Sequence, residues 1–245
     1  MNESETSTEA PKQLGAGSVS LIASPWHTLL VLAIVGLNAY GSLRRAAEAR
    51  AGMGPGRPAT YWRTIVIEWA VLAVVIIGVK LRRVSLDSVL GERWRSVGAA
   101  LRDLALGVGV MIVALVLVSM IGGALGERSA DGAIRFLLPR SSLEVALWIL
   151  VSVSAGICEE AVYRGYLQRQ FAAITGHVTG GIILSGLAFG AVHLYQGVLR
   201  AVSIAILGMF LGVVAHWRKS VRPVMVAHAL QDGIAPMLLR LARHG

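Results

Sequence analysis

Charged residues are scarce in this sequence. Only 15% of its 245 residues are Asp, Glu, Lys or Arg, whereas 55% are hydrophobic and the mean hydropathy is +0.66. A water-soluble domain usually carries about 25% charged and about 45–50% apolar residues. The shortage of charge excludes an ordinary soluble domain, and the composition therefore predicts an integral protein that crosses the membrane several times.

Cysteine is scarcer still, and a signal peptide is lacking. Cys158 is the only cysteine, so no intramolecular disulfide can form and the redox compartment cannot be inferred. We interpret it as a small core residue, with a thiol nucleophile as the lesser alternative. The N-terminus is polar and acidic and lacks the basic start of a secretory signal. We expect residues 1–23 to form a disordered tail.

Acidic residues are outnumbered by basic ones, and the formal net charge is +9. The arginines lie in short segments between apolar runs, which is where membrane proteins place them to fix orientation and contact anionic headgroups. We therefore expect membrane lipids as partners of this charge, and no nucleic acid. The compact, arginine-rich chain favours a multi-pass protein of a bacterial cytoplasmic membrane.

Long apolar runs are abundant. Since a spanning helix needs about 20 mainly apolar residues, the runs predict an all-α bundle of about seven transmembrane helices around a buried polar site. The basic segment 80–102 has spaced apolar positions that predict an interfacial amphipathic helix. We expect transmembrane helices with basic loops over 24–142 and a distinct helical core over 143–245. The predicted helices lie near 25–43, 61–79, 103–125, 143–171, 181–195, 198–217 and 223–242.

Ionisable residues nevertheless occur inside the apolar helices of the C-terminal half. A charge at the bilayer centre costs about 2.5–3.5 kcal/mol on insertion scales, so such residues usually face the bundle interior and mark a functional site. Two histidines and several carboxylates on three different helices indicate one shared site. The residues are Glu159, Glu160, Arg164, His193, His228 and Asp232.

Helical geometry separates the two adjacent glutamates. Glu160 and Arg164 are four residues apart and share a helix face, so we expect them to pair. Glu159 points about 100° away and is free to face a cavity. Phe189 lies one turn before His193 and can restrict its rotation. These spacings predict a structural role for one glutamate and a chemical role for the other.

Simpler interpretations stand beside this one. A histidine in a membrane helix often makes only an interhelical hydrogen bond, and the pair of Glu160 with Arg164 is more often structural. Asp232 near a helix end can act as a cap. Glu68, inside an earlier apolar run, is expected to be paired or interfacial, and Tyr195 to anchor at the membrane surface. The convergence of several such residues favours a site.

Three motifs in order resemble the CPBP family of intramembrane proteases, the CAAX-protease and bacteriocin-processing family, also called Abi-like. Its pattern is EExxxR, then FxxxH, then HxxxN or HxxxD on successive membrane helices. The sequence has EEAVYR from Glu159, FGAVH from Phe189 and HALQD from His228. The resemblance covers roughly 143–240, and it implies proteolysis within the membrane.

The resemblance also implies roles for the catalytic residues. Glu159 with His193 would activate a water molecule, and His228 with Asp232 would stabilise the oxyanion or position the substrate. The third motif ends in Asp where eukaryotic CAAX proteases have Asn. An ionised Asp accepts hydrogen bonds and cannot donate one, so orienting His228 is the role that its chemistry favours. Glu160 would be held by Arg164.

The sequence does not contain HExxH, the arrangement of many soluble zinc proteases. Glu159, His193 and His228 are candidate ligands for a divalent metal such as zinc, or members of a metal-free general-base site, which we favour. The expected substrate is a hydrophobic or lipidated peptide. Alternatives are a non-catalytic scaffold or bacteriocin-immunity protein with the same fold and, less favoured, a proton-coupled transporter.

Overall fold

The computed structural model describes residues 20–126 and 136–241, with side chains up to residue 234. Every regular element in these ranges is helical, so the predicted all-α class is confirmed. The elements are α1 (Pro25–Arg50), α2 (Arg57–Leu81), α3 (Leu86–Leu90), α4 (Val97–Ala124), α6 (Ser142–Glu160), η1 (Ala161–Leu167), α7 (Gln168–Thr175), α8 (Val178–Val192), η2 (Leu194–Gln196), α9 (Val198–Arg218) and α10 (Arg222–Leu241).

The long helices coincide with the seven predicted apolar runs, because α6, η1 and α7 form one continuous helix. Five helices in the described ranges are long and apolar enough to cross a membrane: α1, α2, α4, the continuous α6–α7 and α9. α8 is equally apolar but has only 15 residues. The chain is therefore an integral, multi-pass membrane protein.

Local capping explains where several helices begin and end. The side chains of Ser24, Ser96 and Ser141 accept hydrogen bonds from backbone N–H groups of α1, α4 and α6. Serine is a favoured N-cap because its short side chain reaches donors that have no partner within the helix. α7 ends at Gly176, whose φ of +73° suits glycine best.

The predicted interfacial helix over 80–102 is wrong. Only the five residues of α3 are helical between the end of α2 and the start of α4. α3 ends at Gly91, where φ is +92° and a Cβ atom would lie 2.5 Å from Ser220 Oγ. Val89 is buried and packs beside Gly165 of η1. This segment therefore makes tertiary contacts that periodicity cannot reveal.

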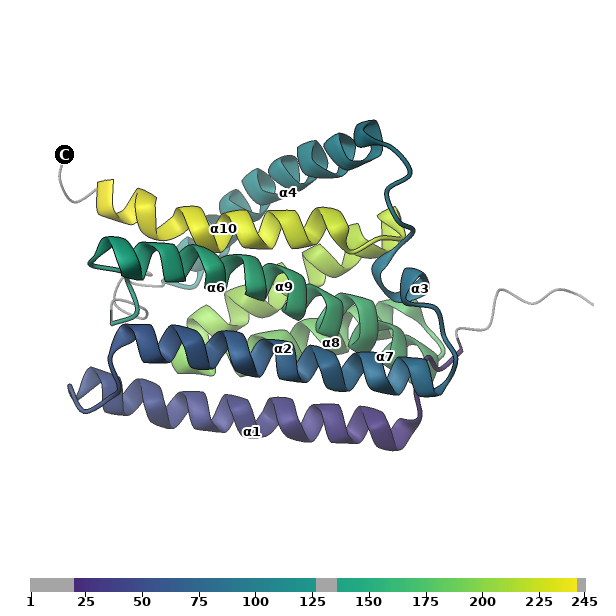
Figure 1. Ribbon diagram of the computed structural model, residues 1–245, viewed down its shortest axis with the longest axis horizontal. Coiled ribbons are helices and arrows are strands. Elements are labelled where there is room, and N and C mark those ends of the chain that lie inside the picture. Colours follow the sequence, from purple (N-terminus) through teal and green to yellow (C-terminus); the bar gives the residue numbers. More distant parts are fainter. Residues whose placement is uncertain (1–19, 127–135, 242–245) are drawn as a thin grey trace, which may run out of the picture.

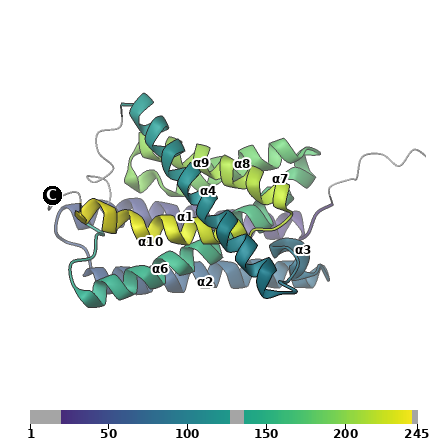
Figure 2. The ribbon, with the colours of Figure 1, turned by 90° about the horizontal axis from the view of Figure 1, so that it is seen from above.

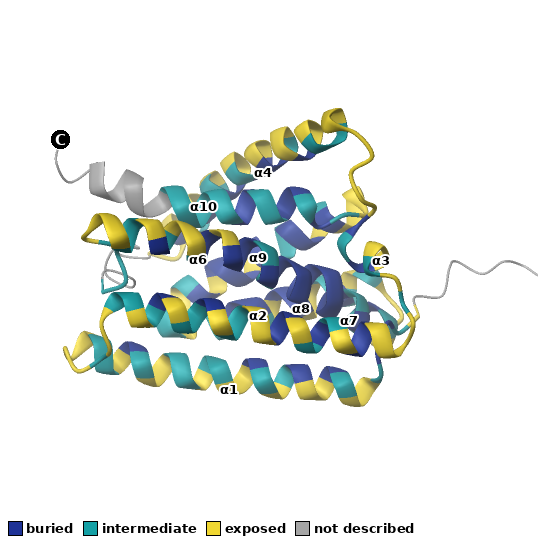
Figure 3. Cartoon of the chain, viewed as in Figure 1, coloured by how far each residue is buried: buried dark blue, intermediate teal, exposed yellow. Residues whose placement is uncertain are grey.

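The continuous helix α6–η1–α7 lies at the centre of the bundle (Figure 1). α6 packs against α2 and α10, and α7 packs against α8, which also contacts α9. α4 crosses over α10 (Figure 2). Exposed positions follow the outer faces of α1, α2 and α4, whereas all seven residues of η1 are buried (Figure 3). The exposed apolar side chains include Leu37, Val66 and Ile112, as expected for lipid-facing helices.

Two glycines allow the close helix contacts around the centre. A Cβ atom at Gly156 would lie 2.7 Å from the carbonyl oxygen of Met225, so α6 can approach α10 only without a side chain there. A Cβ atom at Gly208 would lie 3.2 Å from both Gly186 Cα and Arg164 Nη2. Small residues at such crossings let membrane helices pack backbone to backbone.

Gln170 binds the segment before α1 to α7 through hydrogen bonds. Its Oε1 accepts hydrogen bonds from the backbone N–H groups of Ile22 (2.8 Å) and Ala23 (3.2 Å). Its Nε2 donates to the Ala23 carbonyl (3.1 Å) and to Thr28 Oγ1 (2.6 Å). Of the predicted tail, residues 1–19 lie outside the described residues, whereas Ile22 and Ala23 are buried.

The same contacts continue through Tyr166 to α2. The Tyr166 hydroxyl lies 3.2 Å from Thr28 Oγ1 and 2.7 Å from His27 Nδ1. His27 Nε2 donates to the Val74 carbonyl at 3.0 Å, which leaves Nδ1 as the acceptor for the tyrosine. We call Gln170, Thr28, Tyr166 and His27, with the backbone groups they bind, the Gln170 network.

Candidate active site

The two adjacent glutamates close α6, and the helix widens immediately after them. Ala161–Leu167 form a π-helix, where the expected helix was a regular α-helix through Arg164. π-helical turns are rare and occur often at functional sites. The wider turn does not separate Glu160 from Arg164, because the two side chains still meet across four residues.

Glu160 pairs with Arg164 as the sequence predicts. Arg164 Nη1 donates to Glu160 Oε1 at 2.7 Å, and both side chains are at most 1% exposed. The guanidinium also donates to the Gly208 carbonyl at 3.3 Å and lies 4.2 Å from the centre of the Phe189 ring. A buried charge needs such partners, so this pair holds η1 against α8 and α9.

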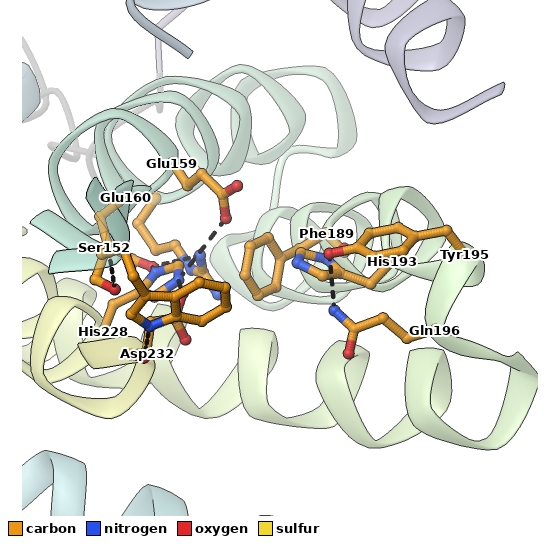
Figure 4. Close-up of polar contacts among 11 residues, drawn as sticks. Ser152, Glu159, Glu160, Phe189, His193, Tyr195, Gln196, His228 and Asp232 are labelled. Carbon is orange, nitrogen blue, oxygen red and sulfur yellow. Dashed lines mark hydrogen bonds and ion pairs between the residues drawn. The ribbon is translucent and has the colours of Figure 1, made fainter. Parts of the chain in front are cut away.

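Glu160 has a second partner that the helical spacing did not reveal. His228 Nδ1 lies 2.7 Å from the same oxygen, Glu160 Oε1, which therefore accepts from both the arginine and the histidine. On the other side of the ring, His228 Nε2 lies 3.4 Å from Asp232 Oδ2 and 3.8 Å from Glu159 Oε2. Glu160 thus orients His228, and Asp232 and Glu159 face its opposite nitrogen (Figure 4).

Asp232 is held through its backbone as well. The indole Nε1 of Trp148 donates to the Asp232 carbonyl at 2.9 Å. That carbonyl would normally bind the N–H four residues later, which is Pro236 and has no N–H. Trp148 therefore supplies the hydrogen bond that the proline cannot, and the Asp232 side chain remains 42% exposed.

His193 presents a free nitrogen. It follows the last residue of α8, and its Nδ1 lies 2.8 Å from the Phe189 carbonyl oxygen. A carbonyl oxygen only accepts hydrogen bonds, so Nδ1 carries the proton. The lone pair of Nε2 is therefore available to accept a hydrogen bond. The Phe189 ring lies 4.8 Å from the His193 ring and 5.8 Å from the His228 ring, and it therefore separates the two imidazoles.

Glu159 is the least satisfied of the predicted site residues. Its side chain is 22% exposed, while its Oε2 is buried and has no hydrogen-bond partner within the protein. It lies within electrostatic range of both His193 and His228 (Figure 4). The structure therefore brings together all six residues predicted to share this site.

Two further residues lie at this cluster, and sequence reasoning gave both a different role. Glu68 of α2 is within electrostatic range of Glu159, His228 and Asp232, and its Oε2 is buried without a hydrogen-bond partner in the protein. The Tyr195 ring stacks on the His193 ring at 6.0 Å and 30°. A carboxylate inside an apolar run was the available signal for Glu68. Nothing in the sequence distinguished Tyr195 from an interfacial tyrosine.

The described side chains do not form a metal site. Among them, no group of three or more His, Cys, Asp or Glu residues is arranged to hold a metal ion. The Nδ1 atoms of the two candidate histidines are engaged by Glu160 and by the Phe189 carbonyl. This engagement leaves each Nε2 open, as in many metal-bound histidines, but Glu159, His193 and His228 do not converge on one metal position.

The comparisons with known proteins identify the C-terminal part of the chain. Residues 141–234 match the family model described as type II CAAX prenyl endopeptidase Rce1-like. Neither the curated proteins nor the solved structures gave a match. The matched segment runs from the N-cap of α6 into α10 and contains all three motifs and every residue of the cluster except Glu68. The resemblance to the CAAX-protease family is thus confirmed, and residues 141–234 form an Rce1-like domain.

Proposed function

We propose that this protein is a CAAX-type intramembrane endopeptidase that hydrolyses a peptide bond with a water molecule activated by Glu159 and His193. The observation that carries the proposal is the buried Oε2 atom of Glu159, which has no hydrogen-bond partner in the protein and lies within electrostatic range of two histidines. A carboxylate oxygen without a hydrogen bond is free to accept a proton from a bound water molecule. The match to the Rce1-like family supports proteolysis as the reaction.

The hydrolytic steps need only groups in this cluster. Glu159 removes a proton from water as the water oxygen adds to the scissile carbonyl carbon, and His193 Nε2 accepts a hydrogen bond that aligns the water. The carbonyl oxygen becomes an oxyanion. When the C–N bond breaks, the proton on Glu159 passes to the leaving amine. The products are a free carboxyl group and a free amine.

The other residues hold this machinery in place. Glu160 binds both Arg164 and His228, so it couples the central helix to α10. His228 directs Nε2 toward the space between Glu159 and Asp232, where a protonated ring donates to a developing negative charge. Asp232 accepts from that nitrogen and limits its orientation.

A hydrophobic or lipidated peptide is the substrate class that this setting favours. The cluster lies on helices whose other faces are apolar, so a substrate reaches it from the lipid phase or the membrane surface. A prenylated CAAX peptide belongs to this class, and the description of the matched family names such peptides. A bacterial cytoplasmic membrane stays our prediction for its location.

The test uses purified full-length protein in detergent with a fluorescence-quenched farnesylated CAAX peptide and an unprenylated hydrophobic peptide. We expect the wild type to cleave at least one of them, and Glu159→Gln to lose activity by about 10³-fold, within the range for removing a general base. Glu92→Gln is the control, because the Glu92 side chain is 81% exposed and pairs with Arg95. Full activity in Glu159→Gln would sink the mechanism, and a wild type inactive on both peptides would favour the scaffold alternative.

Chelation tests the catalytic type. Because the described donors do not converge on a metal position, we expect cleavage to survive treatment with 1,10-phenanthroline. The measurement is the initial rate before and after chelation and after zinc is restored. A rate that falls on chelation and returns with zinc would contradict the glutamate mechanism and require the two histidines to rearrange around a metal.

A further inference from the structure

The cluster is rich in acceptors and poor in donors. Four carboxylates face it, from Glu68, Glu159, Glu160 and Asp232, and an ionised carboxylate cannot donate a hydrogen bond. Peptide hydrolysis creates an oxyanion that needs preorganised donors. The third motif ends in Asp232, and an asparagine at that position would have an amide N–H to donate. The oxyanion therefore needs a donor from another residue.

Most donors near the cluster are already engaged. Arg164 donates to Glu160 and to the Gly208 carbonyl, and the indole of Trp148 donates to the Asp232 carbonyl. His193 Nδ1 donates to the Phe189 carbonyl. His228 can contribute one N–H when its ring is protonated, but its Nε2 faces two carboxylates.

Tyr195 lies beside His193. It lies in η2, two residues after His193, and its ring stacks on the His193 ring with centroids 6.0 Å apart. Arg50 Nη2 donates to its backbone carbonyl at 2.6 Å, which ties η2 to the end of α1. The half-buried side chain directs its hydroxyl back toward the cluster (Figure 4).

The hydroxyl has a proton to give. Gln196 Nε2 donates to the Tyr195 oxygen at 3.0 Å, so that hydrogen bond leaves the phenolic proton uncommitted. The phenol lies within electrostatic range of Glu68, Glu159 and Asp232, and burial raises the pKa of Tyr195 to about 12. The group therefore stays protonated at neutral pH and polarised by its amide neighbour.

We propose that the Tyr195 hydroxyl donates a hydrogen bond to the oxyanion of the tetrahedral intermediate, the donation that Asp232 cannot make. This rests on the proposed endopeptidase function and adds a catalytic residue to it. Attack of water on the carbonyl carbon moves the π electrons to the carbonyl oxygen. The phenolic O–H donates a hydrogen bond to this negatively charged oxygen and keeps its proton. Collapse of the intermediate restores the carbonyl and releases the amine.

The test is Tyr195→Phe, which keeps the ring that stacks on His193 and removes only the hydroxyl. In the farnesylated-peptide assay we expect kcat to fall by about 10²- to 10³-fold, the loss seen when one oxyanion donor is removed, with KM within about twofold. A phosphinate analogue of the same peptide, which mimics the tetrahedral intermediate, should bind more weakly by a similar factor. Tyr40→Phe is the control, because Tyr40 is 62% exposed on α1.

Each outcome decides. A kcat for Tyr195→Phe within about threefold of the wild type would overturn the proposal, and so would a reduced kcat with unchanged phosphinate affinity. A matched loss in both would support it, since a structural stacking role is preserved by phenylalanine. Failure of the underlying function is distinguishable, because it would appear as an inactive wild type and not as a wild type and variant of equal activity.

Discussion

Two buried polar clusters lie on the same central helix, and they differ in how completely their atoms are hydrogen bonded. In the Gln170 network, each side-chain nitrogen and oxygen of Gln170, Thr28, Tyr166 and His27 has a partner. In the cluster around Glu159 and His228, Oε2 of Glu159, of Glu160 and of Glu68 has no hydrogen-bond partner within the protein. The first cluster is neutral in composition, whereas the second is dominated by carboxylates.

The difference indicates what each cluster is for. A fully satisfied neutral network contributes to stability and fixes where α1 begins against α7. Unsatisfied buried carboxylates cost stability, and proteins retain such groups where chemistry requires them. The comparison therefore predicts that mutations separate into those that reduce activity and those that reduce stability.

The largest expected effect belongs to Glu160, which contributes to both properties. Glu160→Gln removes the charge that pairs with Arg164 and the acceptor that orients His228. Breaking a buried pair from one side typically costs about 3–5 kcal/mol, so we expect both a large loss of thermal stability in detergent and an inactive enzyme. Glu92→Gln breaks only an exposed pair with Arg95 and should leave the unfolding temperature unchanged. A stable, active Glu160→Gln protein would contradict the bridging role.

Glu159→Gln should separate activity from stability. The same variant that loses peptide cleavage removes a buried carboxylate oxygen that has no hydrogen-bond partner, so the unfolding temperature should stay equal or rise. Thermal unfolding monitored by intrinsic tryptophan fluorescence measures this. A clear fall in the unfolding temperature would show that Glu159 is also a structural residue, and the contrast between the clusters would weaken.

Gln170→Ala should show the opposite pattern. It leaves the N–H groups of Ile22 and Ala23 and the Ala23 carbonyl without their buried partner. Each such group costs about 1–3 kcal/mol, so we expect a loss of at least about 2 kcal/mol with kcat of the folded protein within about twofold. Tyr40→Phe is the control, because Tyr40 is exposed on α1. Gln196→Ala would not serve, because Gln196 donates a hydrogen bond to Tyr195. A large fall in kcat at unchanged stability would contradict a purely structural role for the Gln170 network.

Trp148→Phe should have the smallest effect. It removes the indole N–H that binds the Asp232 carbonyl and keeps an aromatic ring at the same position. One lost hydrogen bond corresponds to about 1 kcal/mol, and Asp232 would gain some freedom. We expect a modest loss of stability and a rise in KM rather than a fall in kcat. An unchanged protein would show that the carbonyl beside Pro236 needs no partner.

Local rules predicted much of the architecture. The length of the apolar runs alone located the long helices. A helix that faces lipid must form all its backbone hydrogen bonds internally and can contain few charged residues. The spacing of Glu160 and Arg164 predicted their pair, since residues four apart meet even across the π-helical turn. The same rules failed over 80–102. There the helix stops at Gly91, and Val89 is buried against η1, so tertiary packing and not hydrophobic periodicity determines the conformation.

By itself, the sequence determined the positions of the long helices, the residues of the three motifs and the pairing of Glu160 with Arg164, because these depend on hydropathy and neighbouring spacing. Only the tertiary structure decided that Glu160 also binds His228, 68 residues away, and that Glu68 and Tyr195 lie at the cluster. It also placed Gln170 against Ile22. Such contacts depend on which faces of distant helices meet, and side-chain packing between helices sets that.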